Sequence, residues 1–98
     1  MKNKQHDALI ERLQAICGEK INVEILKEFE LDGAAMYIFG FNGGGTAAAI
    51  VYEDGTLFHL HDWQGNCPQT PEEIEDFEWV SESGQSAVVL SGLPRLLA

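Results

Sequence analysis

The sequence predicts an α+β fold in which an N-terminal helix precedes a four-stranded antiparallel meander sheet, an acidic C-terminal helix and a short final strand. The first segment repeats its apolar residues with the period of a helix. The middle of the chain alternates apolar and polar residues between glycine turns, and an acidic segment further on begins like a helix. Ninety-eight residues suffice for one hydrophobic core, so residues 1–98 are expected to form a single domain.

The first helix is expected over residues 4–17, because its apolar residues recur at intervals of three and four and share one face. These residues are Leu9, Leu13, Ile16 and Cys17. Gly18 follows directly and is expected to cap the helix, since glycine readily adopts the left-handed conformation needed there. Nothing on this helix suggests chemistry, so its predicted role is packing.

Residues 21–31 alternate in polarity and are predicted to form a half-buried strand. One face would hold Ile21, Val23, Ile25, Phe29 and Leu31, and the other Asn22, Glu24, Glu28 and Glu30. Asp32-Gly33 matches a two-residue type I′ turn leading into a strand over residues 34–41. This turn would pair Phe29 with Met36 and Glu28 with Tyr37.

A loop is expected at Asn42-Gly43-Gly44-Gly45, followed by strands over residues 46–53 and 56–62. Asp54-Gly55 between these strands is predicted to be a second type I′ turn. The expected pairs are Val51 with Phe58 and Ala49 with Leu60 toward the core, and Ile50 with His59 and Ala48 with His61 on the opposite face.

The acidic segment begins like a helix, with Thr70 as N-cap, Pro71 at the first helical position and a glutamate at the third. Its end is expected between residues 77 and 83. Residues 87–90 are predicted to be a short final strand, and Gly92-Leu93-Pro94 is expected to end the regular structure.

Charge is the strongest functional signal in the sequence. Six Lys and Arg stand against sixteen Asp and Glu, a formal net charge of −10. Between Glu28 and Pro94 there is no Lys or Arg at all. Such a field repels nucleic acid and anionic membranes and favours a basic protein partner. The alternative explanation is that acidity merely keeps a small protein in solution.

The candidate partner-binding surface is the acidic segment, whose carboxylates would steer a basic partner. It comprises Glu72, Glu73, Glu75, Asp76, Glu78 and Glu82. Trp63 and Trp79 are also interface candidates, because aromatic residues dominate binding hot spots, although a core role suits each equally well. Asn42, Gly43 and Gly44 of the glycine loop are the third candidate.

No motif of high specificity for catalysis occurs. The glycine loop lacks the lysine and the spacing of a phosphate-binding loop, and it leads into a strand rather than a helix. His59, His61 and Cys67 are of metal-ligating types, but zinc usually takes three or four ligands at tighter spacing. As a Cys–His pair they lack an evident orienting group. A metal-binding or enzymatic role is therefore the weaker alternative, and we expect no catalytic residue, no metal and no cofactor.

No apolar run approaches the roughly 20 residues that span a membrane, and the N-terminal residues are charged within each helical turn, unlike a signal peptide. We therefore expect a cytoplasmic protein with Cys17 and Cys67 as reduced thiols. An unpaired edge of the sheet leaves a homodimer as one expected assembly.

A strand ending in Phe39-Gly40 leads into the glycine loop, a small-residue strand, the Asp54-Gly55 turn and a closing strand to His61-Asp62-Trp63. In this order, residues 38–63 resemble the SUKH superfamily, which contains bacterial toxin-immunity proteins and the yeast cell-wall-assembly regulator. The resemblance implies an α+β fold with a curved sheet and a non-enzymatic role, namely binding a toxin, often a nuclease, and blocking it.

Charge and resemblance together predict a small acidic inhibitor of the immunity type, which neutralises a toxin by occluding a basic surface. A close alternative is a phage-encoded anti-defence inhibitor that acts as a nucleic-acid mimic. Small size and acidity suit both predictions equally.

Overall fold

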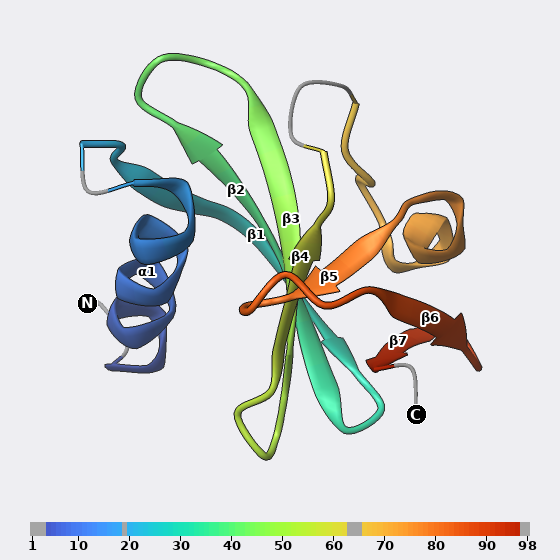
Figure 1. Ribbon diagram of the computed structural model, residues 1–98. Coiled ribbons are helices and arrows are strands. Elements are labelled where there is room, and N and C mark those ends of the chain that lie inside the picture. Colours follow the sequence, from blue (N-terminus) through green and yellow to red (C-terminus); the bar gives the residue numbers. More distant parts are fainter. Residues whose placement is uncertain (1–3, 19, 63–65, 97–98) are drawn as a thin grey trace.

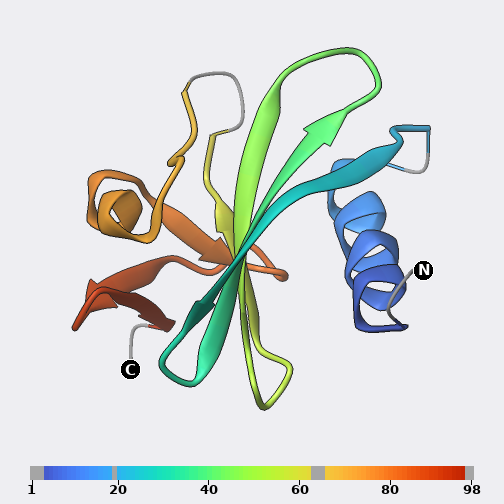
Figure 2. The same ribbon diagram turned by 180° about the vertical axis from the view of Figure 1, so that it is seen from behind.

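The computed structural model describes residues 4–18, 20–62 and 66–96 and has an α+β fold, as predicted (Figure 1). Helix α1 (Lys4–Cys17) lies on one side of an antiparallel sheet of five strands in chain order. These are β1 (Val23–Leu31), β2 (Ala34–Phe41), β3 (Thr46–Tyr52), β4 (Leu57–Leu60) and β5 (Trp79–Ser81). The other side carries a 3₁₀ helix and a separate two-stranded hairpin (Figures 1 and 2). These are η1 (Pro71–Asp76) and the pair β6 (Ala87–Leu90) and β7 (Leu93–Leu96).

We call the side covered by α1 the helix face and the opposite side the hairpin face. Because side chains alternate along a strand, the register assigns each residue to one of them. The helix face holds Ile25, Tyr37, Phe39, Ala47, Ala49 and His59. The hairpin face holds Met36, Ile38, Ala48, Ile50 and Phe58.

The first helix and the first hairpin confirm most of their predictions. Helix α1 has the predicted bounds, and Gly18 caps it with φ 113° and an N–H donated to the Gln14 carbonyl at 2.7 Å. Strands β1 and β2 pair Phe29 with Met36, as predicted. The turn between them is not type I′, because of its two central residues Gly33 alone has a positive φ, 79°. A type II turn requires positive φ only at that second position.

The predicted faces of the first strand are wrong after residue 25. Ile25 pairs with Phe39 and Lys27 pairs with Ile38, so Leu26 is an extra residue, a β-bulge. Its side chain is half exposed and lies over the backbone of the neighbouring strand, where a Cβ on Gly40 would come within 3.2 Å of Leu26 Cδ1. The bulge shifts the alternation by one, so residues beyond it change faces.

The predicted pairing between β3 and β4 is wrong by one residue. The observed pairs are Ala49 with His59, Ile50 with Phe58 and Val51 with Leu57. A one-residue slip moves every side chain of the strand to the other face. His59 therefore lies on the helix face, and Phe58 lies on the hairpin face.

The slip arises because this turn has three residues instead of two. Tyr52 donates its N–H to the Thr56 carbonyl at 2.8 Å, and Gly55, the one turn residue with positive φ, donates to the Tyr52 carbonyl at 2.9 Å. This is a type I turn followed by a glycine bulge. The same pair of backbone hydrogen bonds closes the loops at residues 42–44 and 82–84, each ending in glycine.

The predicted acidic C-terminal helix begins at Pro71 as expected, but it is a short 3₁₀ helix that ends before the predicted range of 77–83. The described structure has a six-residue 3₁₀ helix, η1, which ends at Asp76, and the chain then becomes strand β5. The Thr70 side chain makes no capping bond, while the Glu73 carboxylate accepts the Gln69 N–H at 2.5 Å. Residues 79–81 are all buried. They form a strand because pairing with β4 buries Trp79 and Val80, whose residue types are favoured in strands.

The last regular element was also not predicted. Gly92-Leu93-Pro94 does not end the structure, because Leu93–Leu96 forms β7, which pairs with the predicted strand β6. Ser91 and Gly92 between them both have positive φ, 54° and 81°. Positive φ at both central residues is the mark of a type I′ turn.

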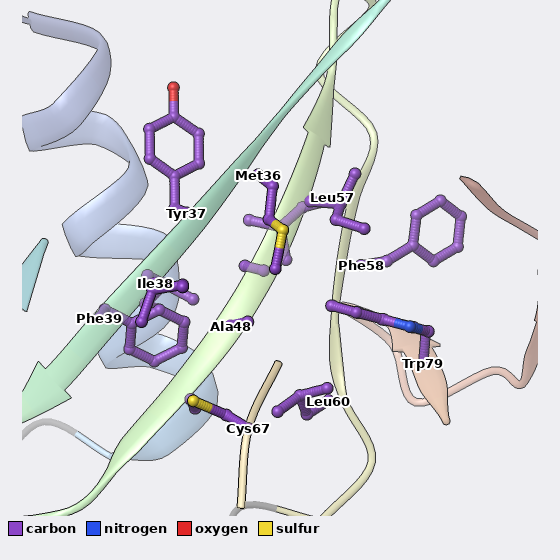
Figure 3. Close-up of a cluster of buried hydrophobic side chains, with 14 of the residues drawn as sticks. Met36, Tyr37, Ile38, Phe39, Ala48, Leu57, Phe58, Leu60, Cys67 and Trp79 are labelled. Atoms are coloured by element: carbon purple, nitrogen blue, oxygen red, sulfur yellow. The ribbon is translucent and has the colours of Figure 1, made fainter. Parts of the chain in front are cut away.

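The hairpin face carries a dry core. Phe58, Leu60 and Trp79 are at most 2% exposed. The Trp79 indole N–H donates to the Ile74 carbonyl at 2.9 Å, which ties β5 to η1. Figure 3 shows Phe58 and Trp79 on the side of β4 away from α1, and Tyr37 beside the helix. Within the described residues, no helix combines the length and apolar character needed to cross a membrane.

Candidate functional site: an acidic cleft between the helix and the sheet

A cleft of about 580 Å³ opens on the helix face, between α1 and strands β1, β2 and β3. We call it the acidic cleft, defined by the carboxylates of Glu28, Glu30 and Glu53 and by the phenol of Tyr37. The strands also contribute the small side chains Ala35 and Val51, which leave room above the sheet. A volume of this size lies in the range of ligand-binding clefts.

The β-bulge at Leu26 brings two of these carboxylates into the cleft. Beyond it, Glu28 pairs with Tyr37 and Glu30 pairs with Ala35, both residues of the helix face. Without the bulge, strict alternation would place the two glutamates on the hairpin face. The sequence-based assignment of an acidic face opposite Ile25 is therefore corrected, since Ile25, Glu28 and Glu30 share one face.

One end of the cleft is closed by Arg12. Its Nη2 donates to the Gly55 carbonyl at 2.7 Å, and its Nε donates to Glu82 Oε2 at 3.2 Å. A second guanidinium contact to Glu82 completes an ion pair. The charge of Arg12 is thus matched by Glu82, which lies outside the cleft lining, and does not balance the three cleft carboxylates.

His6 lies at the cleft margin, where its Nε2 contacts the Glu28 carboxylate. Its ring also meets the Tyr37 ring edge-on, with centroids 5.7 Å apart and an interplanar angle of 89°. These contacts hold the first turn of α1 against β1 and β2. They also orient Glu28 and the aromatic wall of the cleft relative to each other.

The hydroxyl of Tyr37 has an unusual environment for a buried residue. The residue is 7% exposed and lines the acidic cleft, yet its hydroxyl forms no hydrogen bond with any residue that the structure describes. Burial, and secondarily the Glu28 carboxylate, raise the pKa of the phenol above its ordinary value, so it stays protonated. The hydrogen-bonding capacity of this hydroxyl is therefore directed at the cleft, toward water or a group that enters it, and not at the fold.

The acidic residues predicted as a binding surface are divided by the structure. Five of them lie on and just after η1, on the hairpin-face side: Glu72, Glu73, Glu75, Asp76 and Glu78. All are exposed except Glu73, which is half-buried. Glu82 is separate, because it lies in the turn after β5 and pairs with Arg12 of α1. The predicted continuous helical surface is therefore not present.

The predicted interface residues differ in position. Trp79 is 1% exposed and belongs to the core, which corrects its assignment to an interface. Trp63 lies outside the described residues. Asn42, Gly43 and Gly44 are exposed at the tip of the β2–β3 loop, beside a hollow of about 320 Å³ that they line with Phe41 of β2.

The alternative metal or catalytic set is not assembled. His59 is buried on the helix face, while Cys67 is buried with its Sγ 3.1 Å from Thr46 Oγ1, on the hairpin face. His61 is exposed. Among the described residues, no group of three His, Cys, Asp or Glu side chains is placed to hold a metal ion. The thiols of Cys17 and Cys67 are both free.

Sequence reasoning missed Glu28, Glu30, Glu53 and Tyr37 as site residues. One signal could have located the two glutamates of β1. Ile25 and Leu26 are consecutive apolar residues within an otherwise alternating strand, which is the pattern of an inserted residue. No comparable local signal marks Tyr37, because its environment depends on how α1 packs against the sheet.

Comparisons of the chain with models of protein families, with curated proteins and with solved structures gave no match. The resemblance of residues 38–63 to the SUKH superfamily therefore stays a prediction.

Proposed function

We propose that this protein is an acidic binding protein that inhibits a basic protein partner, in the manner of an immunity protein that neutralises a toxin. The observation that carries the proposal is the segment from Glu28 to Pro94, which contains twelve acidic residues and no Lys or Arg. The proposed role is binding and occlusion rather than catalysis.

The structure supports the proposal by exposing these charges. All twelve acidic residues lie in the described part of the chain, and eleven of them are exposed. They occur on both sides of the sheet, around η1 and around the acidic cleft. An acidic surface of this extent raises the association rate with a basic partner and disfavours acidic ones.

Inhibition would follow from occlusion. A basic surface that contacts nucleic acid or another anionic ligand would be covered by the carboxylates around η1, namely Glu72, Glu75, Asp76 and Glu78. A cytoplasmic location and a homodimer remain predictions that accompany this proposal.

Capture from a lysate of the source cell tests the proposal. The immobilised protein is expected to retain a basic protein that is released as salt is raised, because screening weakens exposed charge interactions. Adding the protein to the captured partner should reduce the activity of that partner. Retention of an acidic or neutral protein, or retention indifferent to salt, would contradict the proposal.

The location of the steering charges can be measured with the captured partner. Reversing Glu72, Glu73, Glu75 and Asp76 to lysine is expected to slow association, more strongly at low salt than at high salt. Unchanged association rates would show that the residues around η1 are not the steering surface.

A further inference from the structure

We infer that the acidic cleft receives an arginine side chain from a basic protein segment, with the Glu28, Glu30 and Glu53 carboxylates and the Tyr37 hydroxyl as its partners. This inference rests on the proposed function and adds a second contact, on the opposite side of the sheet from the carboxylates around η1, together with its chemistry. Two independent observations support it: the charge of the cleft and the state of Tyr37.

The first observation is charge complementarity. Three carboxylates line one cleft, two from β1 and one from the turn after β3, and the guanidinium that closes its end is paired with Glu82. An added cation would therefore meet the charges of Glu30 and Glu53, which Arg12 does not balance, and the Glu28 carboxylate, which also contacts His6 Nε2. A guanidinium is the favoured cation, because its planar set of five donors can bind more than one carboxylate at once.

The second observation is the Tyr37 hydroxyl, which is buried in the cleft wall without a hydrogen-bond partner among the described residues. A protonated phenol oxygen can accept a hydrogen bond from a guanidinium N–H. An arginine in the cleft would satisfy this group, and it would lie against an aromatic ring, a contact that favours guanidinium over ammonium.

The size and walls of the cleft suit a side chain carried by a peptide. The volume of about 580 Å³ exceeds what a single side chain needs, so neighbouring residues of the segment would also enter. Ala8 on α1 and Ala35 and Val51 on the sheet supply apolar walls for the methylene stem of the arginine.

Binding of a fluorescent octa-arginine peptide tests the inference by comparing two variants of equal charge. The cleft variant carries Glu28→Gln, Glu30→Gln and Glu53→Gln. The control variant carries Glu72→Gln, Glu75→Gln and Glu78→Gln, three exposed residues on the hairpin-face side. The cleft variant is expected to lose about tenfold in affinity, mainly through faster dissociation, and the control about twofold, through slower association.

A second pair of variants blocks the cleft without altering charge. Ala8 and Ala15 are both exposed on α1, but of the two Ala8 alone lines the cleft. Ala8→Trp is expected to weaken octa-arginine binding about as much as the cleft variant, whereas Ala15→Trp should leave it unchanged. An octa-lysine peptide should bind more weakly than octa-arginine to the unmodified protein.

The outcomes separate this inference from the proposed function. Equal loss in the cleft and control variants, or no octa-arginine binding by the unmodified protein, overturns the cleft as the arginine site while leaving the salt-dependent capture of a basic partner to stand. Loss confined to the cleft variant and to Ala8→Trp supports the site. In that case, a lysate that yields no basic partner overturns only the proposed function.

Discussion

Tyr52 and Tyr37 are buried to nearly the same extent, 8% and 7% exposed, but they lie on opposite faces of the sheet. The Tyr52 hydroxyl donates to the Pro94 carbonyl, and Arg95 lies over its ring at 4.4 Å from the centroid. The Tyr37 hydroxyl has no such partner among the described residues and lines an acidic cleft. A tyrosine hydroxyl therefore forms a hydrogen bond within the fold on the hairpin face, whereas on the helix face a tyrosine hydroxyl lines the cleft without such a bond to any described residue.

The difference extends to the two faces as a whole. On the hairpin face, the buried donors Trp79 and Tyr52 reach carbonyls of η1 and β7, so polar groups are satisfied as the core forms. On the helix face, α1 leaves a cleft lined by carboxylates. The core of the hairpin face is therefore expected to determine stability, and the helix face to provide the arginine contact in addition to the carboxylates around η1. The predictions that follow test this division.

The largest effect is expected at the hairpin face. Trp79→Ala should lower the free energy of unfolding by about 3–5 kcal/mol, because it leaves a cavity and removes the donor to the Ile74 carbonyl. Urea unfolding followed by circular dichroism measures the loss. If the variant does not fold at all, the milder Trp79→Phe gives the measurable value. A loss below about 1 kcal/mol would contradict the central place of Trp79 in this core.

A smaller loss is expected for Tyr52→Phe. The ring and its contact with Arg95 are retained, and the hydrogen bond to the Pro94 carbonyl is removed, so unfolding should become easier by about 1 kcal/mol. Hydrogen exchange should accelerate most at the amides of β6 and β7, which this bond ties to the sheet. Uniform acceleration across the sheet would argue against such a local tie.

The elements predicted well are those that local sequence determines. The apolar stripe of α1 and its Gly18 cap, and the register of β1 with β2 next to their turn, depend on neighbouring residues. The sequence-based predictions are wrong where contacts between residues far apart in the sequence determine the local structure. Phe77 to Ser81 can follow a helix start or form a strand, and the edge of β4 selects the strand because it buries Trp79.

The candidate site was missed for a related reason. Two single-residue irregularities, the bulge at Leu26 and the third turn residue at Gly55, each move a set of side chains to the opposite face. The first carries Glu28 and Glu30 into the cleft, and the second places His59 on the helix face, away from Cys67. Charge could be counted from the sequence, but its distribution between the two faces depended on these irregularities.

His59 provides a pH-dependent test of the helix face. Its Nδ1–H donates to the Leu60 carbonyl at 3.0 Å. Burial lowers the pKa of the imidazole below its ordinary value, although hydrogen bonds to the Leu60 and Ser81 backbone, and then the Glu82 charge, oppose this shift. The unfolded chain therefore binds the proton first as pH falls. This residue should have no effect on stability well above about pH 6.5 and should destabilise the fold progressively below it.

The comparison that checks this is urea unfolding of the unmodified protein and of His59→Gln at about pH 7.5 and about pH 5.5. The unmodified protein should lose more stability between these two pH values than His59→Gln. Equal losses in both proteins would show that His59 already titrates normally in the folded state.

Tyr37→Phe is expected to change stability least, and it tests most directly whether the two faces of the sheet differ in role. It removes a hydroxyl that bonds to no described residue and keeps the ring that His6 contacts edge-on, so unfolding should change by no more than about 0.5 kcal/mol. Tyr52→Phe is its matched control, since it makes the same chemical change at the same depth of burial. If Tyr37→Phe lowers the free energy of unfolding as much as Tyr52→Phe does, both hydroxyls stabilise the fold. That result would contradict the proposed difference in role between the two faces. A stable Tyr37→Phe variant that nonetheless binds octa-arginine more weakly would place the function of this hydroxyl in binding, because the variant alters no charge and no packing.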